Sequence, residues 1–308
     1  MPERDACELT YALVTPTRND AANLGRLGAC LAAQTVLPTE WIIVENGSSD
    51  DTAAVADSLA LQLPWARALH TPGERVAVRS VPIVHAFNAG LRELRCDSDI
   101  VVKLDSDVTM ASDYFARLLA AFSSEPSLGM TSGICHEKTN DGWEPLYGTR
   151  SFVWGACRAY RRACLADVLP LEEHEGWDDI DALKARLRGW KVGSINDLPL
   201  RHHRTTGTRD GTIRNWTSQG ETAHYLGYRP TYLVLRALYR AWRQPRRLAM
   251  IWGFVHATAA GWSQCPDAEV RAFMRREQSP FRLGRRARES LGRDPGITAP
   301  RSPPSGGA

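Results

Sequence analysis

The stretch Ile100-Val-Val-Lys-Leu-Asp-Ser-Asp107 joins a run of apolar residues directly to two carboxylates. Short apolar runs without alternation are typical of strands that are buried on both faces of a sheet. Tyr11–Thr15 and Trp41–Val44 have the same character, and polar residues follow each of them. We therefore expect buried, mostly parallel strands with a polar cluster at the carboxyl end of each.

Segments with helical spacing separate these runs. The expected helices are Asn23–Ala33, Thr52–Leu61, Ala86–Leu94 and Asp113–Phe122. Strands that alternate with helices predict an α/β fold, an open and mostly parallel Rossmann-like sheet with helices on both faces. Ligands of such sheets bind beyond the carboxyl ends of the strands. The clusters expected to converge on one cleft are Thr15–Arg18, Glu45–Asp51 and Asp105–Asp107.

The pattern changes after Gly155. It predicts a helix over Gly176–Gly189, a short strand over Lys191–Ile195, a polar loop over His202–Gly211, and mostly helices from Trp216 onward. The last residues are rich in Pro, Gly and Ser, which is typical of disorder. The expected organisation is a tail over 1–8, a catalytic domain over 9–212, a helical Arg-rich region over 213–292 and a disordered tail over 293–308.

Composition excludes several classes of protein. The chain of 308 residues has a formal net charge of only +3, which does not favour a nucleic-acid binder. Its 7 cysteines contain no CxxC pair, which favours reduced thiols in a cytoplasmic protein over a disulfide framework or a zinc site. The longest apolar stretch, Leu248–Trp262, is too short to span a bilayer comfortably.

Basic residues far outnumber acids between Arg229 and Arg293, among Trp and Tyr side chains. Such a region is suited to peripheral contact with the inner face of an anionic membrane. A solvated helical face explains the same pattern, so both interpretations stay open.

The paired carboxylates carry the most informative chemistry. Asp105 and Asp107 offer the hard oxygen ligands that Mg²⁺ and Mn²⁺ prefer, and such an ion bridges the two phosphates of a nucleotide donor. An acidic turn without a ligand is the alternative. In the same way, Glu45 and Asn46 end a strand where they are able to bond a base or ribose, whereas Ser49 or Asp50 are expected to cap the next helix.

Four motifs in this order resemble the signature of family 2 glycosyltransferases with the GT-A fold. They are Val-Thr-Pro-Thr-Arg-Asn (14–19), Ile-Val-Glu-Asn-Gly-Ser-Ser-Asp-Asp-Thr (43–52), His-Ala-Phe-Asn-Ala-Gly (85–90) and Lys-Leu-Asp-Ser-Asp (103–107). The resemblance implies that the first two motifs hold a nucleotide and that the fourth holds the metal and ribose. The implied nucleotide-sugar contacts are Thr15, Pro16, Arg18, Glu45, Asn46, Asp105 and Ser106, with Arg79, Asn88 and Lys103 as weaker candidates. The family often has two acids where this chain has Glu45-Asn46, which leaves the base open.

Gly176-Trp-Asp-Asp-Ile-Asp181 resembles the Glu-Asp motif that supplies the catalytic base of inverting members. An acceptor hydroxyl is a poor nucleophile until a positioned carboxylate takes its proton. Adjacent acids raise one another's pKa, which suits a base working near neutral pH. We predict Asp179 as the base and Asp178 as an acceptor contact. Capping of the helix N-terminus is the alternative role.

A second polar cluster follows at His202-His203-Arg204, with Arg209 nearby. Either histidine is able to complete the metal shell, and the arginines suit a diphosphate. Gly207 and Gly211 suggest a loop that closes over bound donor. By resemblance, Gly155 is small so that the donor sugar approaches the backbone.

Together these features predict a metal-dependent inverting glycosyltransferase that uses Mn²⁺ or Mg²⁺. It transfers a sugar from a nucleotide-diphosphate donor to a saccharide or lipid-linked acceptor in the synthesis of a surface polysaccharide or glycoconjugate. The main alternative is a HAD-type phosphatase with Asp105 as nucleophile, although about a hundred residues precede its motif here. A sugar nucleotidyltransferase would need a Gly-rich basic loop after the first strand, and a non-catalytic sugar-nucleotide binder would not need all the acids.

Overall fold

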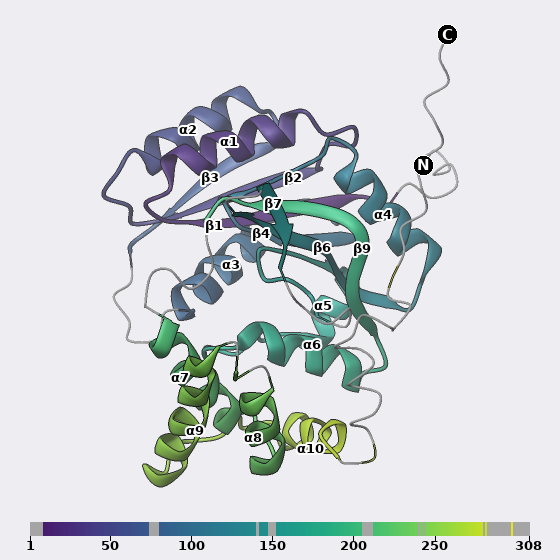
Figure 1. The fold of residues 1–308 in the computed structure, drawn as a ribbon. Helices are drawn as coiled ribbons and strands as arrows, with labels where there is room; N and C mark the ends of the chain where they lie inside the picture. Colours follow the sequence, from purple (N-terminus) through teal and green to yellow (C-terminus); the bar gives the residue numbers. More distant parts are fainter. Residues whose placement is uncertain are drawn as a thin grey trace.

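The computed structural model describes residues 9–73, 80–139, 142–146, 152–204, 212–239, 241–242, 244–279, 281 and 297. In these residues one nine-stranded sheet runs through the molecule in the order β3-β2-β1-β4-β8-β6-β9-β5, with β7 paired to β6 (Figure 1). The strands are β1 Tyr11–Thr17, β2 Glu40–Asn46, β3 Ala66–Thr71, β4 Ile100–Leu104, β5 Val108–Met110, β6 Leu128–Thr139, β7 Gly142–Pro145, β8 Cys157–Arg161 and β9 Lys191–His202.

Helices cover both faces of this sheet. They are α1 Ala21–Ala32, α2 Thr52–Gln62, α3 Val81–Glu93, α4 Tyr114–Ser124, α5 Arg162–Val168 and α6 Trp177–Leu187. Side chains of α1, α2 and α4 pack in one core with Leu13 and Val102, while those of α3, α5 and α6 pack in the other with Val14 and Val101. Neighbouring strand residues thus enter opposite cores, as the period of a strand requires. This burial on both faces explains the unbroken apolar runs.

The first half of the sheet is parallel and the second half is mixed. β3, β2, β1 and β4 run parallel, so their carboxyl ends share one edge. β8 then pairs antiparallel with β4, and β6 pairs parallel with β9. The predicted α/β fold class is confirmed.

Close packing of α3 on the sheet depends on Gly90. A Cβ atom at this position would lie 2.4 Å from Val14 Cγ1 and 2.9 Å from Val44 Cγ2. Such distances are too short for carbon atoms, so only glycine allows this approach.

One predicted boundary was wrong. The strand expected to end at Ile195 continues as β9 to His202, so His202 belongs to the sheet and not to a loop. The register of β9 against β6 shifts between Ser194 and Pro199, so Asn196 and Asp197 lie in an irregularity of the strand. Because these two polar residues interrupt the apolar pattern, the sequence suggested that the strand ends before them.

Beyond β9 the described part of the chain forms helices that lie beneath α6 in Figure 1. They are α7 Thr212–Tyr225, α8 Pro230–Leu238, the 3₁₀ turn η1 Pro245–Leu248, α9 Ala249–Ala259 and α10 Ala268–Glu277. α7 and α9 touch through Gly220 and Gly253, where an added Cβ would lie about 2 Å from a backbone oxygen of the other helix. None of the described helices is long and apolar enough to cross a membrane.

The two predicted tails fall largely outside the described residues. This holds for 1–8 and for all of 293–308 except Ile297. Ile297 is buried and forms an isolated parallel bridge with Ile195 of β9.

Candidate active site

The Asp105-Ser106-Asp107 turn follows β4 at the edge where the parallel strands end. The backbone N–H of Asp105 donates to the Ala156 carbonyl at 2.8 Å, which extends the β4–β8 pairing into the turn. Lys103, the last but one residue of β4, is buried and its ammonium forms an ion pair with Asp105. The same ammonium donates to the Gly155 carbonyl at 2.9 Å. Lys103 therefore ties the acidic turn to the segment that carries Gly155.

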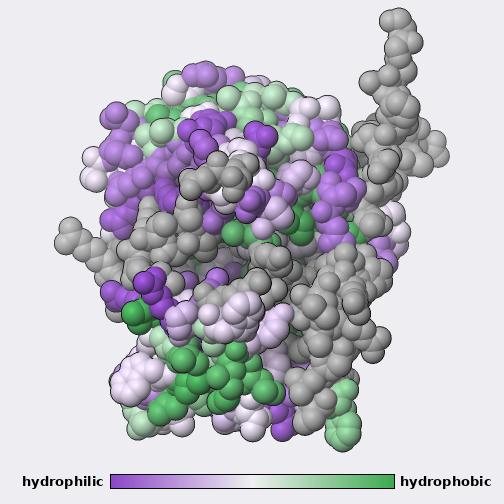
Figure 2. Space-filling view, viewed as in Figure 1, coloured by the Kyte–Doolittle hydropathy of each residue, from purple (hydrophilic) through white to green (hydrophobic). Residues whose placement is uncertain are grey.

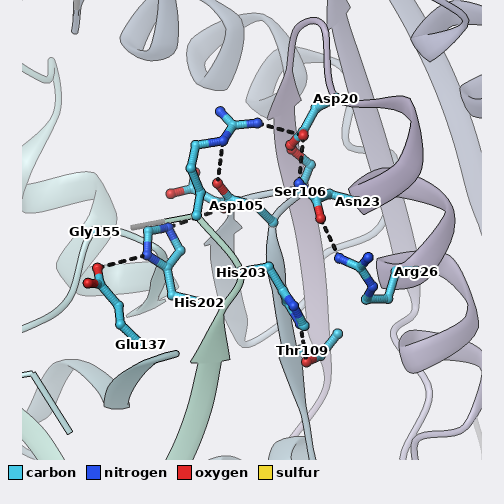
Figure 3. A network of polar contacts seen from close by, with 12 residues as sticks. Asp20, Asn23, Arg26, Asp105, Ser106, Thr109, Glu137, Gly155, His202 and His203 are labelled. Atoms are coloured by element: carbon cyan, nitrogen blue, oxygen red, sulfur yellow. Dashed lines mark hydrogen bonds and ion pairs between the residues drawn. The ribbon is translucent and has the colours of Figure 1, made fainter. Parts of the chain in front are cut away.

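Strand pairing places His202 between two carboxylates. β9 lies between β6 and β5, so His202 is opposite Glu137 on one side and Val108 on the other. His202 Nδ1 lies 3.4 Å from Glu137 Oε1, and its Nε2 lies 3.4 Å from Asp107 Oδ1. Figure 3 shows the ring between Glu137 and the acidic turn.

The side chain of His203 points away from that of His202. Its Nε2 lies 2.8 Å from the Thr109 hydroxyl, and its ring meets the edge of Trp143 at 5.1 Å between centroids. Figure 3 shows it pointing toward Thr109, away from Glu137. The geometry therefore brings the ring of His202, and not that of His203, to the Asp107 carboxylate, while the His203 backbone N–H donates to the Asp107 carbonyl at 2.8 Å.

Arg204 and Asp20 complete this cluster. Arg204 Nη2 lies 2.6 Å from Asp20 Oδ1, and Arg204 Nε lies 3.5 Å from Asp107 Oδ2. The Ser106 hydroxyl donates to Asp20 Oδ2 at 2.5 Å. Asp20 follows β1, so it connects the end of β1 to the acidic turn after β4 (Figure 3). Arg209 lies outside the described residues.

The two carboxylates of the turn have different electrostatic surroundings. Burial raises the pKa of Asp105, and the nearby charge of Asp107 adds to this against the opposing effect of Lys103. Burial also favours a higher pKa for Asp107, but His202, Arg204 and Lys103 outweigh it and hold that pKa below its usual value. Burial favours a lower pKa for His202, but Asp107 and Asp105 outweigh it and raise the pKa. Asp107 is thus the carboxylate that stays ionised.

Asp107 and His202 fit a divalent cation that is shared with a substrate. Asp107 Oδ1 is buried and has no hydrogen-bond partner within the described residues. Within the same ranges, no three His, Cys, Asp or Glu side chains converge closely enough to hold a metal ion by themselves. Mg²⁺ is commonly held by one or two carboxylates together with substrate phosphates. The donor set present here matches that mode of binding better than a closed protein site.

The predicted nucleotide contacts lie at the ends of β1 and β2, with varied surroundings. Glu45 is buried, and its carboxylate accepts from the Ser48 backbone N–H at 2.5 Å and lies 3.3 Å from His70 Nδ1. Burial favours a higher pKa for Glu45, but the bonds from Ser48 and His70 outweigh it and lower the pKa. Asn46 accepts from the Thr71 hydroxyl at 3.2 Å.

The side chain of Thr15 is engaged in the core, where its oxygen accepts from Trp41 Nε1 at 2.9 Å. Pro16 is half-buried and Arg18 is exposed. Asn88 is half-buried on α3, while Arg79 lies outside the described residues.

The predicted base motif forms the start of α6. Gly176 precedes the helix with φ +83°, a conformation that favours glycine, and a Cβ there would also meet Thr222 Cγ2 at 2.5 Å. Asp178 and Asp179 stand in the first turn, where the helix dipole favours negative charge. Burial, together with the negative charge of Asp178, nevertheless raises the pKa of Asp179 from an ordinary 3.8 to about 6.

A buried ion pair fixes this turn. Arg158 on β8 and Asp181 on α6 are both fully buried, and two guanidinium nitrogens bond the carboxylate at 2.7 and 2.9 Å. The Tyr160 hydroxyl donates to the same carboxylate at 2.5 Å. Arg158 also donates to the carbonyl of Asp178. The sheet thus determines where Asp178 and Asp179 lie.

Asp178 and Asp179 line a pocket of about 590 Å³ between the start of α6 and the helices α7 and α8. Its lining combines aromatic rings, carboxylates and guanidinium groups. These are Phe152, Trp154, Trp216 and Tyr228, then Glu175, Asp178 and Asp179, then Arg236 and Arg247. Rings with carboxylates are what a sugar requires, since its C–H faces are apolar and its hydroxyls are donors.

Gly155 connects this pocket to the acidic turn. Its carbonyl accepts from Lys103, and a Cβ at this position would lie 3.2 Å from Asp178 Oδ2. A larger side chain would therefore fill the space between the two clusters.

Sequence reasoning missed several residues of this site. Asp20 directly follows the first motif, and this position after the first strand is the signal that could have identified it. Thr17 ends β1 opposite Glu45, and its buried hydroxyl has no partner in the described part of the chain. Trp216 and Arg236 line the pocket from helices far along the chain, and no local sequence pattern predicts that they do so.

Known proteins resemble this chain in sequence and in fold. The sequence model of Glycosyl transferase family 2 matches residues 12–169, about half of the chain. The O-antigen chain rhamnosyltransferase RfbN of Salmonella typhimurium is 21% identical over 226 residues, which are 63% of this chain and 66% of that protein.

Two solved structures share the fold. The mannosyltransferase PcManGT from Pyrobaculum calidifontis, solved with GDP-Man and Mn²⁺, has a TM-score of 0.57 at 16% identity and covers 94% of this chain and 89% of its own. S. aureus TarS 1–349, solved with UDP-GlcNAc, has a TM-score of 0.53 at 15% identity and covers 92% of this chain and 89% of its own. These comparisons give no support to the phosphatase alternative, and the chain belongs to glycosyl transferase family 2.

Proposed function

We propose that this glycosyltransferase uses a nucleotide-diphosphate sugar and a divalent cation, and that it inverts the anomeric centre. The observation that carries the proposal is the placement of Asp179. Asp179 lines a sugar-sized pocket together with Asp178, and Gly155 contacts both sides: it lies beside the Asp178 side chain, and its carbonyl accepts from Lys103, which pairs with Asp105 of the acidic turn. A base and a diphosphate site therefore adjoin the same space.

The donor would bind across the carboxyl ends of β1, β2 and β4. Glu45, Asn46 and the backbone at Thr15 and Pro16 would hold the nucleoside. Arg204 and Lys103 would face the phosphates, since guanidinium and ammonium groups stabilise such anions. Arg18, Arg79, Asn88, Ser106 and Arg209 remain candidates for the same role.

Asp107 and His202 would hold the cation, Mn²⁺ or Mg²⁺, and Asp105 is a further candidate ligand. When bound, the ion neutralises charge that grows on the leaving diphosphate. Support comes from Asp107 Oδ1, which is buried, accepts no hydrogen bond within the described residues and lies 3.4 Å from His202 Nε2. The mannosyltransferase of similar fold was solved with Mn²⁺.

The chain's own chemistry would be proton transfer and exclusion of water. Asp179 takes the proton of an acceptor hydroxyl, and that oxygen forms a bond to the anomeric carbon from the face opposite the diphosphate. The bond between the anomeric carbon and the phosphate oxygen breaks, and the diphosphate leaves with both electrons. The raised pKa of Asp179 gives it the basicity that this step needs.

The acceptor would occupy the pocket between residues 9–212, which we assign to the catalytic domain, and the helical region 213–292. Trp154 and Trp216 would pack on sugar rings, and Asp178 would bond acceptor hydroxyls. The relative from Salmonella acts on O-antigen chains by its name. We therefore infer a saccharide or lipid-linked saccharide acceptor in the synthesis of a surface polysaccharide or glycoconjugate.

Release of nucleoside diphosphate tests the proposal. The purified chain is incubated with UDP-, GDP- and dTDP-sugars and a panel of saccharide and lipid-linked saccharide acceptors, with Mn²⁺, Mg²⁺ or a chelator. We expect release from one nucleotide class, dependent on the metal and strongly reduced in Asp179→Asn. Asp97→Asn is the matched control, because Asp97 is exposed and precedes β4 at the end opposite Asp105. Absence of release from every donor, or undiminished release in the chelator, contradicts the proposal.

A further inference from the structure

The helices α8 and α9 and the turns next to them expose an unusual number of large apolar side chains. We define the apolar face by Leu235, Leu238, Trp242, Trp252, Val255 and Trp262. Trp242 is 77% exposed and Trp252 is 65% exposed. Figure 2 shows a hydrophobic patch over the helices at the bottom of the view, where Figure 1 has α7, α8 and α9. Soluble proteins expose such patches mainly where they bind a partner.

Helices α8 and α9 each have a buried inner side, so the exposed apolar side chains are additional to the residues that pack against the protein. Leu233 and Ala237 bury the inner side of α8, and Gly253 and Ala257 bury the inner side of α9. The outer side of a helix in a soluble protein is normally polar. Here the outer side is apolar too, and Trp252, His256 and Trp262 form a continuous row of rings with centroid distances of 6.1 and 5.5 Å.

The stretch of sequence that carries the apolar face has charges of one sign only. Between Pro230 and Ser263 the chain carries five arginines and no aspartate or glutamate. Arg246, on η1 within this stretch, is exposed. Indole rings, aliphatic side chains and arginines without acids are the combination that sits in the interface of an anionic bilayer. A twofold contact with a second copy would instead bring the same arginines against one another.

We propose that this chain docks on an anionic lipid bilayer through the apolar face. Docking would also bring the pocket to the lipid, because α8 contributes Arg236 to the pocket lining and Leu235 and Leu238 to the apolar face. The bilayer thereby becomes the source of the acceptor, which carries a lipid anchor. The part that concerns the acceptor rests on the proposed function, whereas lipid docking itself does not.

Vesicle co-sedimentation of the full chain tests the docking. Vesicles consist of phosphatidylcholine alone or of phosphatidylcholine mixed with phosphatidylglycerol. We expect binding to the anionic vesicles only, and weaker binding as salt is raised. Trp242→Ala with Trp252→Ala should lower the affinity by about tenfold or more, because two indoles no longer leave water. Arg246→Gln should lower it by about fivefold, the loss of one cation near the surface.

Leu61→Ala is the matched control, since Leu61 is 89% exposed on α2, on the other side of the sheet domain. It should bind like the unchanged chain. Release of nucleoside diphosphate from soluble donor should stay unchanged in the Trp variant, which shows that its fold is intact. The docking proposal is overturned if anionic vesicles are not bound, if the Trp variant binds them equally well, or if that variant only converts a dimer to a monomer. If nucleoside diphosphate is released but vesicles are not bound, the docking proposal fails and the transferase proposal stands. If vesicles are bound but no nucleoside diphosphate is released, the transferase proposal fails and the docking proposal stands.

Discussion

Replacing Asp179 with Asn should remove transferase activity and stabilise the fold at the same time. A positioned general base contributes about 10²–10⁴-fold to a rate. Asn has almost the same shape but does not accept the acceptor's proton, so we expect kcat to fall within that range. In the unchanged chain kcat/KM should rise as pH increases through about 6, because Asp179 acts only when deprotonated.

The gain in stability follows from the same raised pKa. The pKa of Asp179 is about 6 in the folded chain against an ordinary 3.8. Ionisation of Asp179 therefore destabilises the fold. The effect is absent at pH values below the unfolded pKa and reaches about 3 kcal/mol above the folded pKa, because each unit of pKa difference corresponds to about 1.36 kcal/mol. Asn carries no charge at any pH. Its advantage should be absent near pH 4, grow as pH rises through about 6, and then stay constant.

Urea unfolding of both chains on each side of pH 6, beside the release assay, measures both effects. The free energy of unfolding should be higher for Asp179→Asn above pH 6 and equal for the two chains near pH 4. A variant that is active would refute the role of base. A variant that is less stable above pH 6, or whose gain does not depend on pH, would refute the electrostatic reasoning.

Three further predictions concern the support of this site. Asp178→Asn should shift the rise of kcat/KM to lower pH, because a neighbouring negative charge is removed; an unchanged profile would show that the two carboxylates are not coupled. Arg158→Met should lower the free energy of unfolding by about 3–5 kcal/mol by leaving Asp181 charged and buried without its partner, and urea titration checks this. Gly90→Ala should cost about 1–3 kcal/mol by thermal or urea unfolding, because its methyl group would overlap side chains of β1 and β2. The matched change Gly25→Ala, where the closest atom is 3.9 Å away, should be neutral or stabilise by up to about 1 kcal/mol.

Much of the first half of the fold could be predicted because its signals are local. The apolar run that begins at Ile100 forms a strand that is buried on both faces. Asp105 follows it at the carboxyl end, where parallel sheets bind their ligands. The Gly176 motif begins α6 as expected. Each of these features is encoded by neighbours in the sequence.

The rest depends on contacts between distant residues. His202 seemed to be in a loop, because only the pairing of β9 with β6 and β5 shows that it faces Glu137 and Asp107. The two adjacent histidines look equivalent in the sequence, yet alternation along the chain sends them in opposite directions. The hydrogen bond from Trp41 to the Thr15 hydroxyl joins residues 26 positions apart, and no local pattern indicates it. Strand register and long-range packing have no local signature in one sequence.

Calorimetric titration with UDP, GDP and dTDP, with and without Mn²⁺, measures whether a divalent cation takes part in nucleotide binding. We expect that one nucleotide binds, that Mn²⁺ strengthens its binding, and that Asp107→Ala removes this dependence on the metal while Asp97→Ala does not. Equal binding of a nucleotide with and without Mn²⁺, or binding that Asp107→Ala leaves unchanged, would contradict this expectation.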